Sequence, residues 1–321
     1  MNDFESQWNA LGAKHHSSGR LRVYPDHRLD FFIDYSLNGN RELIIEAGDI
    51  VFNFPELPFF ENLEVIFAQT SNGARIGITL TDEHLFKSFT VMCFDIAERS
   101  KGGKNVEVSF MIALECLRDW SELFKRRGKI GLTRNEVIGL WGELYTLESI
   151  LQANVAPDEL IVQGWRGPNG DQRDIGFNKT RIEVKTQLAT KAISLRITSL
   201  DQLDDGGNNL KLALNRITPS DKGFSVIVLA QRLFQRFESN RVAHSEFERK
   251  IVLAGLSEDL EVCKEKFGLD ERLIYEVAEN FPKLTLSNVP VGINAAEYVI
   301  SGAAITSFQI DWDKLVETLS E

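Results

Sequence analysis

The clearest alternation of apolar and polar residues in the chain lies at residues 180–187. Ile182 and Val184 are β-branched and point away from the polar residues between them, so this stretch predicts a half-buried strand. The polar side of the strand carries Arg181, Glu183, Lys185 and Gln187. A second strand is expected at 173–177, with a turn at 178–179, where an asparagine tolerates the positive φ of a tight hairpin.

The length of this turn decides which side chains meet across the hairpin. With two turn residues, Phe177 pairs with Thr180. Counting outward places Asp174 directly opposite Glu183, with Cβ atoms roughly 4.5–5.5 Å apart. Two like charges in this position destabilise a hairpin unless a cation lies between them. A three-residue turn would place Val184 opposite Asp174 instead, so the acidic pair depends on the turn length.

Helical periodicity appears upstream of the hairpin. Thr133 and Glu136 have the spacing of a capping box, so a helix is expected to begin near Arg134. Apolar residues then recur at helical spacing at Val137, Leu140, Trp141, Leu144, Leu147 and Leu151. Glu143 lies beside this apolar stripe, which sets it apart from an ordinary solvated glutamate. The alternative is a boundary glutamate that pairs with an arginine.

Shorter apolar segments predict the rest of the fold. The N-terminal part is expected to contain strands at 21–24, 31–36, 43–46, 63–68 and 74–80, then helices at 83–99 and 106–125. After the hairpin the pattern predicts strands at 193–198 and 224–230, a helix at 242–256, a helix from 257 to 268, extended segments at 273–278 and 296–304, and a short terminal helix. The run at 224–230 is apolar throughout, as in a strand buried on both faces.

Together these elements predict an α/β (α+β) fold in three regions. Residues 1–130 form a β-strand-rich region with two helices, and glycines at 128–131 mark a hinge into the next region. Residues 131–235 form a core with a mixed central sheet flanked by helices, and residues 236–321 form an α/β extension.

Charge is distributed unevenly along the chain. The net charge is −11 over 321 residues, yet the stretch from 164 to 199 contains seven basic and three acidic residues. A locally basic stretch in an acidic protein suits transient binding to DNA and argues against a high-affinity, non-specific DNA coat protein. The three cysteines are scattered, the N-terminus lacks a signal-peptide core, and no apolar run is long enough to span a bilayer. A cytoplasmic location without a membrane segment is therefore expected.

The acidic pair and Lys185 have the chemistry that phosphodiester hydrolysis requires. Mg²⁺ takes oxygen ligands at about 2.0–2.1 Å and keeps several waters, so two carboxylates hold it while a substrate phosphate adds another ligand. The cation acts as a Lewis acid and lowers the pKa of its bound water. Lys185 lies two residues after Glu183 on the same side, where an amine can orient or deprotonate that water or stabilise the transition state.

Asp174, followed by Glu183-Val184-Lys185, resembles the motif of the PD-(D/E)XK nuclease superfamily. This superfamily includes restriction endonucleases, resolvases and mismatch-repair nicking enzymes. Arg173 stands where the motif has its proline, a common departure that removes no metal ligand. A wider pattern, formed by 139–144, 164–168 and the hairpin, resembles a bacterial family of unknown function described as PD-(D/E)XK proteins.

The resemblance implies a restriction-endonuclease-like core and a metal-dependent DNA endonuclease. Its catalytic residues would be Asp174, Glu183, Lys185 and Glu143. The three acids Asp174, Glu183 and Glu143 would bind Mg²⁺, with Mn²⁺ as a substitute. The resemblance further suggests a bacterial restriction or phage-defence setting beside methyltransferase or ATPase partner proteins. The sequence does not decide the oligomeric state, and a homo-oligomer is one of the open alternatives.

Several side chains near the hairpin are candidate substrate contacts: Arg166, Arg173, Arg181 and Gln187. The arginines would otherwise neutralise nearby acids, and Gln187 would otherwise be an ordinary exposed residue. Trp165 is expected to anchor the core. Two other functions stay open, namely a catalytically inactive subunit that binds DNA or protein in a defence complex, and an α/β ligand-binding protein whose hairpin matches by accident.

Overall fold

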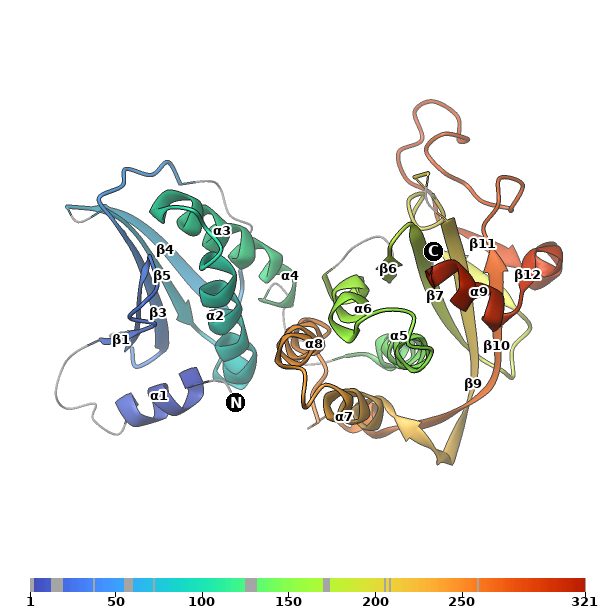
Figure 1. Ribbon diagram of the computed structural model, residues 1–321, viewed down its shortest axis with the longest axis horizontal. Helices are drawn as coiled ribbons and strands as arrows, with labels where there is room; N and C mark the ends of the chain where they lie inside the picture. Colours follow the sequence, from blue (N-terminus) through green and yellow to red (C-terminus); the bar gives the residue numbers. More distant parts are fainter. Residues whose placement is uncertain are drawn as a thin grey trace. The chain divides into compact units, whose positions relative to one another are not determined.

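The chain folds as two units, Met1–Ile130 and Gly131–Glu321, each with its own main β-sheet in the computed structural model (Figure 1). The structure describes residues 3–12, 20–36, 38–54, 60–71, 73–124, 132–169, 174–204, 206–207, 209–258 and 260–320. The hinge expected at 128–131 and the candidate contact Arg173 lie outside these ranges.

The N-terminal unit contains a five-stranded antiparallel sheet in the order β1-β2-β3-β5-β4. Its strands are β1 (Leu21–Val23), β2 (Asp30–Tyr35), β3 (Arg41–Gly48), β4 (Leu63–Thr70) and β5 (Gly73–Leu80), and they confirm the five predicted strands. Its helices are α1 (Asp3–Gly12), a 3-10 turn η1 (Glu83–Leu85), α2 (Phe86–Ser100), α3 (Val106–Asp119) and α4 (Ser121–Phe124). The helix predicted at 106–125 is thus divided in two, and α1 has no counterpart among the predicted elements. Figure 1 shows α2 and α3 against one face of the sheet.

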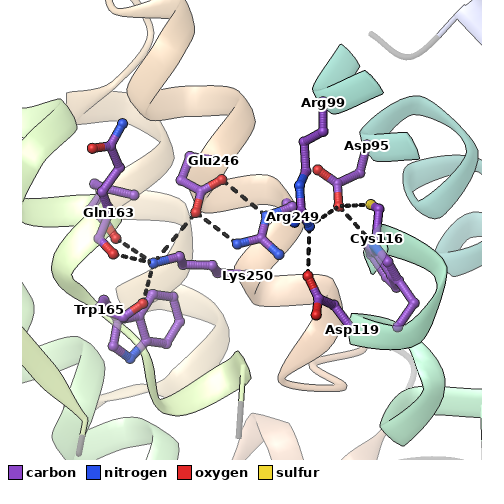
Figure 2. A network of polar contacts seen from close by, with 11 residues as sticks. Asp95, Arg99, Cys116, Asp119, Gln163, Trp165, Glu246, Arg249 and Lys250 are labelled. Atoms are coloured by element: carbon purple, nitrogen blue, oxygen red, sulfur yellow. Dashed lines mark hydrogen bonds and ion pairs between the residues drawn. The ribbon is translucent and has the colours of Figure 1, made fainter. Parts of the chain in front are cut away.

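A polar cluster links α2 and α3 inside this unit. Asp95 of α2 is buried and accepts hydrogen bonds from Trp120 Nε1 at 2.8 Å and from Cys116 Sγ at 3.0 Å. Arg99 places a guanidinium nitrogen 3.7 Å from the same carboxylate and 2.8 Å from Asp119 (Figure 2). Each of these contacts joins the two helices or lies within one of them, so Asp95 is a structural acid.

The C-terminal unit contains a mixed five-stranded sheet in the order β12-β10-β9-β7-β6. Its strands are β6 (Ile175–Phe177), β7 (Thr180–Leu188), β9 (Asn209–Ser225), β10 (Lys266–Glu276) and β12 (Gln309–Ile310). β7 and β9 are parallel, whereas the other neighbouring pairs are antiparallel. β10 and β12, from the region beyond residue 236, therefore belong to the same sheet as the hairpin.

Both faces of the mixed sheet are covered (Figure 1). On one face an apolar core joins it to the helices α5 (Arg134–Gln152), α6 (Asp158–Gly164), α7 (Val226–Arg236), α8 (Arg241–Leu253) and α9 (Trp312–Ser320). On the other face a second core lies under a two-stranded sheet of β8 (Ser194–Ile197) and β11 (Tyr298–Ser301). Short 3-10 turns complete the unit at η2 (Gly167–Asn169), η3 (Glu261–Lys264), η4 (Gly302–Ala304) and η5 (Thr306–Phe308). Among the described helices, none combines the length and apolar character needed to cross a bilayer.

The prediction of a buried strand at 224–230 is wrong, because α7 begins there. The hydroxyl of Ser225 accepts a hydrogen bond from the backbone of Val228 at 3.3 Å and caps the helix. Leu229 and Leu233 are then buried one turn apart. A short apolar run does not by itself separate a strand from a buried helix, and here the cap and the continuing helical spacing decide.

The helix predicted from 257 to 268 is also wrong. The described residues of this stretch form the 3-10 turn η3, and β10 already begins at Lys266 and runs through Gly268 while pairing with β9. Long-range pairing with a 17-residue strand therefore overrides a weak local helix signal. The extended segment expected at 296–304 is a strand only at β11 and continues into η4, and α6 has no predicted counterpart.

Candidate active site

The hairpin has the predicted register. Phe177 pairs with Thr180 and Ile175 pairs with Ile182, so the turn contains two residues. Asn178 adopts a positive φ of 49°, the conformation for which asparagine is suited in a tight turn. The turn-length prediction is confirmed.

Asp174 stands at the end of this hairpin, immediately before β6. Its Oδ2 accepts a hydrogen bond from the backbone N–H of Val184 at 2.7 Å. Because β6 is only three residues long, it pairs with β7 as far as Ile182, and no other described strand continues the pairing on this side. The carboxylate therefore satisfies a backbone N–H of β7 one residue after Glu183.

Glu183 and Lys185 project from the centre of β7. Glu183 is 2% exposed, and its Oε1 lies 2.7 Å from Lys185 Nζ. The two residues are in register with Leu212 and Leu214 of β9, which belong to the apolar core under β8 and β11. An ion pair that is held in so apolar a setting loses hydration, so both side chains are fixed rather than freely solvated.

Glu143 reaches this strand edge from α5. The helix begins with the predicted capping box, since Thr133 and Glu136 exchange hydrogen bonds between side chain and backbone. It packs closely on β7 because Gly142 has no side chain, and a Cβ there would lie 1.8 Å from Thr186 Oγ1. This close approach positions the next residue, Glu143, beside the acids of the hairpin.

The segment after α6 brings the acids together. Trp165 is fully buried and donates from Nε1 to Glu143 Oε2 at 2.8 Å. The backbone N–H groups of Arg166 and Gly167 both donate to the carbonyl of Asp174, at 2.6 and 3.2 Å. A Cβ on Gly167 would lie 2.4 Å from Glu143 Oε2 and 3.3 Å from Asp174 Oδ1. The two carboxylates thus converge on the bare Cα of Gly167.

Burial raises the pKa values of Asp174 and Glu143. Burial raises the pKa of Asp174 to about 6, although the Val184 N–H and the charge of Lys185 act in the opposite direction. The pKa of Glu143 is raised well above its ordinary value, chiefly by burial and then by the charge of Asp174, against the hydrogen bond from Trp165. A cation beside these acids would relieve the repulsion and favour their charged forms.

The donor chemistry of the three acids fits a hard divalent cation. Carboxylate oxygens are the ligands that Mg²⁺ prefers, and Asp174, Glu183 and Glu143 supply them, with the charges of Asp174 and Glu183 both acting on Glu143. As the side chains stand, no set of three or more His, Cys, Asp or Glu residues in the described ranges is close enough to hold a metal ion. Metal binding here would therefore require these side chains to move.

Two of the other candidate contacts hold backbone groups of the hairpin and of the chain that follows it. Arg181 donates to the carbonyls of Asn178 and Thr180, each at 3.0 Å, and so braces the turn. Gln187 donates to the carbonyl of Ala192 at 2.8 Å and accepts from a backbone N–H, which holds the chain after β7. Arg166 is exposed. Trp165 anchors the core as expected, with its ring centroid 5.7 Å from that of Phe247. The sequence does not predict its hydrogen bond to Glu143.

Comparison with known proteins identifies a family. No curated protein and no solved structure matches the chain. A family model described as "Putative PD-(D/E)XK family member, (DUF4420)" matches residues 4–302. The mixed sheet flanked by helices is consistent with the restriction-endonuclease-like fold of such proteins. The chain belongs to this PD-(D/E)XK family.

Proposed function

We propose that the protein is a Mg²⁺-dependent endonuclease that hydrolyses phosphodiester bonds in DNA, with Mn²⁺ as a substitute cation. The observation that carries the proposal is the convergence of the Glu143 and Asp174 carboxylates at Gly167, beside the Glu183–Lys185 pair. Membership of a PD-(D/E)XK family supports the same reaction class. We place the activity in bacterial restriction or phage defence, with methyltransferase or ATPase proteins as its partners.

Each residue has a distinct role in this proposal. Asp174, Glu183 and Glu143 hold the cation, which when bound supplies a Lewis acid and a more acidic water. The Val184 N–H and the Trp165 indole orient two of these acids, each through one carboxylate oxygen. Lys185, which Glu183 holds at 2.7 Å, orients the attacking water and stabilises the negative charge that develops on the phosphate.

A catalytically inactive, DNA- or protein-binding subunit is the second candidate. The Lys185–Glu183 contact of 2.7 Å favours it, because an ammonium at this position competes with a cation for the same carboxylate oxygen. The absence of a three-acid group at metal-binding distance in the described part of the chain favours it too. In this alternative the lysine takes the place of the cation and closes the site.

Cleavage assays separate the two candidates. Purified wild type, Lys185→Ala and Lys179→Ala would be incubated with plasmid, linear and phage-type modified DNA in Mg²⁺ or Mn²⁺. Lys179 is an exposed residue of the same hairpin, so its variant is a matched control for the loss of one lysine. We expect cleavage by wild type and Lys179→Ala and none by Lys185→Ala. DNA binding without cleavage in all three proteins would favour the second candidate, and equal cleavage by all three would contradict the assigned role of Lys185.

A further inference from the structure

Lys250 lies outside the hairpin and α5, yet it contacts the segment that supports them. It belongs to α8, is fully buried, and donates from Nζ to the carbonyls of Val162 at 2.8 Å and Gln163 at 2.9 Å. A third, shorter hydrogen bond reaches the carbonyl of Trp165 (Figure 2). These carbonyls lie where α6 ends, where the last carbonyls of a helix lack their usual i+4 donors, so one ammonium supplies a hydrogen bond to each of the three.

The charge of Lys250 is balanced locally. Glu246 Oε1 lies 3.5 Å from Lys250 Nζ and also binds Arg249 at 2.8 Å (Figure 2). The negative end of α6 adds a second favourable interaction with the ammonium. A compact ammonium has three donors on one atom, which suits three carbonyls that surround one point, whereas a planar guanidinium does not.

Lys250 and Glu143 both bind Trp165. The carbonyl of Trp165 binds Lys250, its backbone N–H donates to Val162 at 3.1 Å, and its indole N–H donates to Glu143 Oε2 at 2.8 Å. The indole ring also packs against Phe247, which lies one turn before Lys250 on the same face of α8. Any shift of the Trp165 backbone would therefore be transmitted directly to the Glu143 carboxylate.

We propose that Lys250 is a positioning residue of the candidate active site. By binding the carbonyls where α6 ends, it fixes Trp165 so that the indole N–H holds Glu143 towards Asp174 and Gly167. The effect of Lys250 on DNA cleavage rests on the proposed function. The positioning of Trp165 and Glu143 is a property of the fold and is measured without DNA.

The indole N–H of Trp165 gives a direct reading of the positioning. The chain has five tryptophans, so protein labelled with ¹⁵N at the indole gives five side-chain signals by NMR, and Trp165→Phe identifies one of them. In Lys250→Met we expect the Trp165 signal to shift towards its position in Glu143→Ala and its hydrogen exchange to accelerate about tenfold. With DNA and Mg²⁺, cleavage by Lys250→Met should fall about 10- to 100-fold.

Lys211→Met is the matched control. Lys211 is another buried lysine of the same unit, but its Nζ binds Glu276 Oε1 at 2.7 Å. Its loss should lower stability while leaving the Trp165 signal, its exchange and the cleavage rate of the folded protein unchanged. An unaltered Trp165 signal in folded Lys250→Met, or an equal change in Lys211→Met, would overturn the proposal.

A second variant tests the proposal if Lys250→Met does not fold. Lys250→Arg keeps the positive charge and should give a smaller shift of the same indole signal, and no shift at all would overturn the proposal. A Trp165 signal that depends on Lys250, in a wild-type protein that cuts no DNA, would support the positioning and contradict the proposed function. If Lys250→Met cleaves DNA at the wild-type rate, the role of Lys250 in catalysis is contradicted, whereas its positioning of Trp165 is not.

Discussion

Two carboxylates in this chain accept a hydrogen bond from a tryptophan indole, and they have different surroundings. Asp95 of the N-terminal unit accepts from Trp120 at 2.8 Å, and Glu143 of the C-terminal unit accepts from Trp165 at the same distance. The local pairing is therefore the same in both units. What differs is the set of groups that completes the environment of each acid.

Hydrogen-bond donors surround the Asp95 carboxylate, whereas other acids lie near the Glu143 carboxylate. Around Asp95, the thiol of Cys116 lies at 3.0 Å and a nitrogen of Arg99 at 3.7 Å. Around Glu143, burial and then the charges of Asp174 and Glu183 raise the pKa of its carboxyl group, against the Trp165 hydrogen bond and the charge of Lys185. The first arrangement is a closed structural contact, whereas in the second the charged acids repel one another, a repulsion that protonation or a cation would relieve. The groups that neighbour a buried acid, rather than its burial, therefore distinguish a candidate active site from a structural contact in the core.

Removing an acid from each cluster should give the largest difference. Asp174→Asn keeps a side-chain oxygen for the Val184 N–H but loses the charge, so Mg²⁺-dependent plasmid nicking should fall on the order of 1,000-fold. Asp95→Asn should instead lower the free energy of unfolding by about 1–3 kcal/mol, because it removes the ion pair with Arg99 and leaves a buried amide that matches its donors poorly. Initial nicking rates per folded molecule and urea unfolding measure the two effects. Similar losses of nicking in both variants would contradict the distinction.

Filling the space at Gly167 should have the next largest effect. In Gly167→Ala the new Cβ would displace the Glu143 carboxylate without removing any ionisable group, so cleavage should fall about 100-fold. Gly139→Ala on α5 is the matched control, because a Cβ there meets nothing within 4 Å. The control should cleave DNA normally and be more stable by about 0.5–1 kcal/mol, since alanine favours a helix. Normal cleavage by Gly167→Ala would show that the carboxylates do not act at this point.

The raised pKa of Asp174 predicts a pH-dependent stability. Its folded-state pKa of about 6 lies above the ordinary value of 3.8, so protonation stabilises the fold below about pH 4 and this contribution is lost as the pH rises through 6. Asp174→Asn should therefore be more stable than wild type at pH 7.5, on the order of 2 kcal/mol, and of similar stability at pH 4. Urea unfolding at both pH values measures the difference. Mg²⁺ at pH 7.5 should raise the Tm of wild type more than that of the variant.

Arg181 should show the smallest effect. Because its guanidinium braces the hairpin turn, Arg181→Ala should lower the free energy of unfolding by about 0.5–1 kcal/mol and leave the salt dependence of DNA binding unchanged. A phosphate contact would behave differently, since its loss reduces the salt slope by about one. Fluorescence anisotropy with labelled DNA at several salt concentrations distinguishes these results.

Features that depend on neighbouring residues were predictable from the sequence. The alternation at 180–187 and the Asn178 turn determined the hairpin register, and the spacing of Thr133 and Glu136 gave the start of α5. Both are local signals, because strand alternation and helix caps act over a few residues. The position of Glu143 beside the apolar stripe of α5 followed from the same helical spacing.

Features that depend on tertiary contacts were not predictable in this way. Gly167 contacts the acids only because α6 and the following turn return to the hairpin, and a glycine-rich segment alone predicts no more than a turn. Lys250 lies 85 positions from Trp165 in the chain, and its burial against three carbonyls has no sequence signature. The run at 224–230 was misassigned because its apolar residues suit a strand or a buried helix equally well.

Anomalous diffraction from crystals grown with Mn²⁺ tests the central claim most directly. The account predicts a Mn²⁺ peak at the carboxylates of Asp174, Glu183 and Glu143, with Lys185 displaced from Glu183 Oε1. The same crystals of Asp174→Asn should lack the peak. Wild-type crystals in which Lys185 keeps its contact with Glu183 and no Mn²⁺ binds these acids would contradict the account.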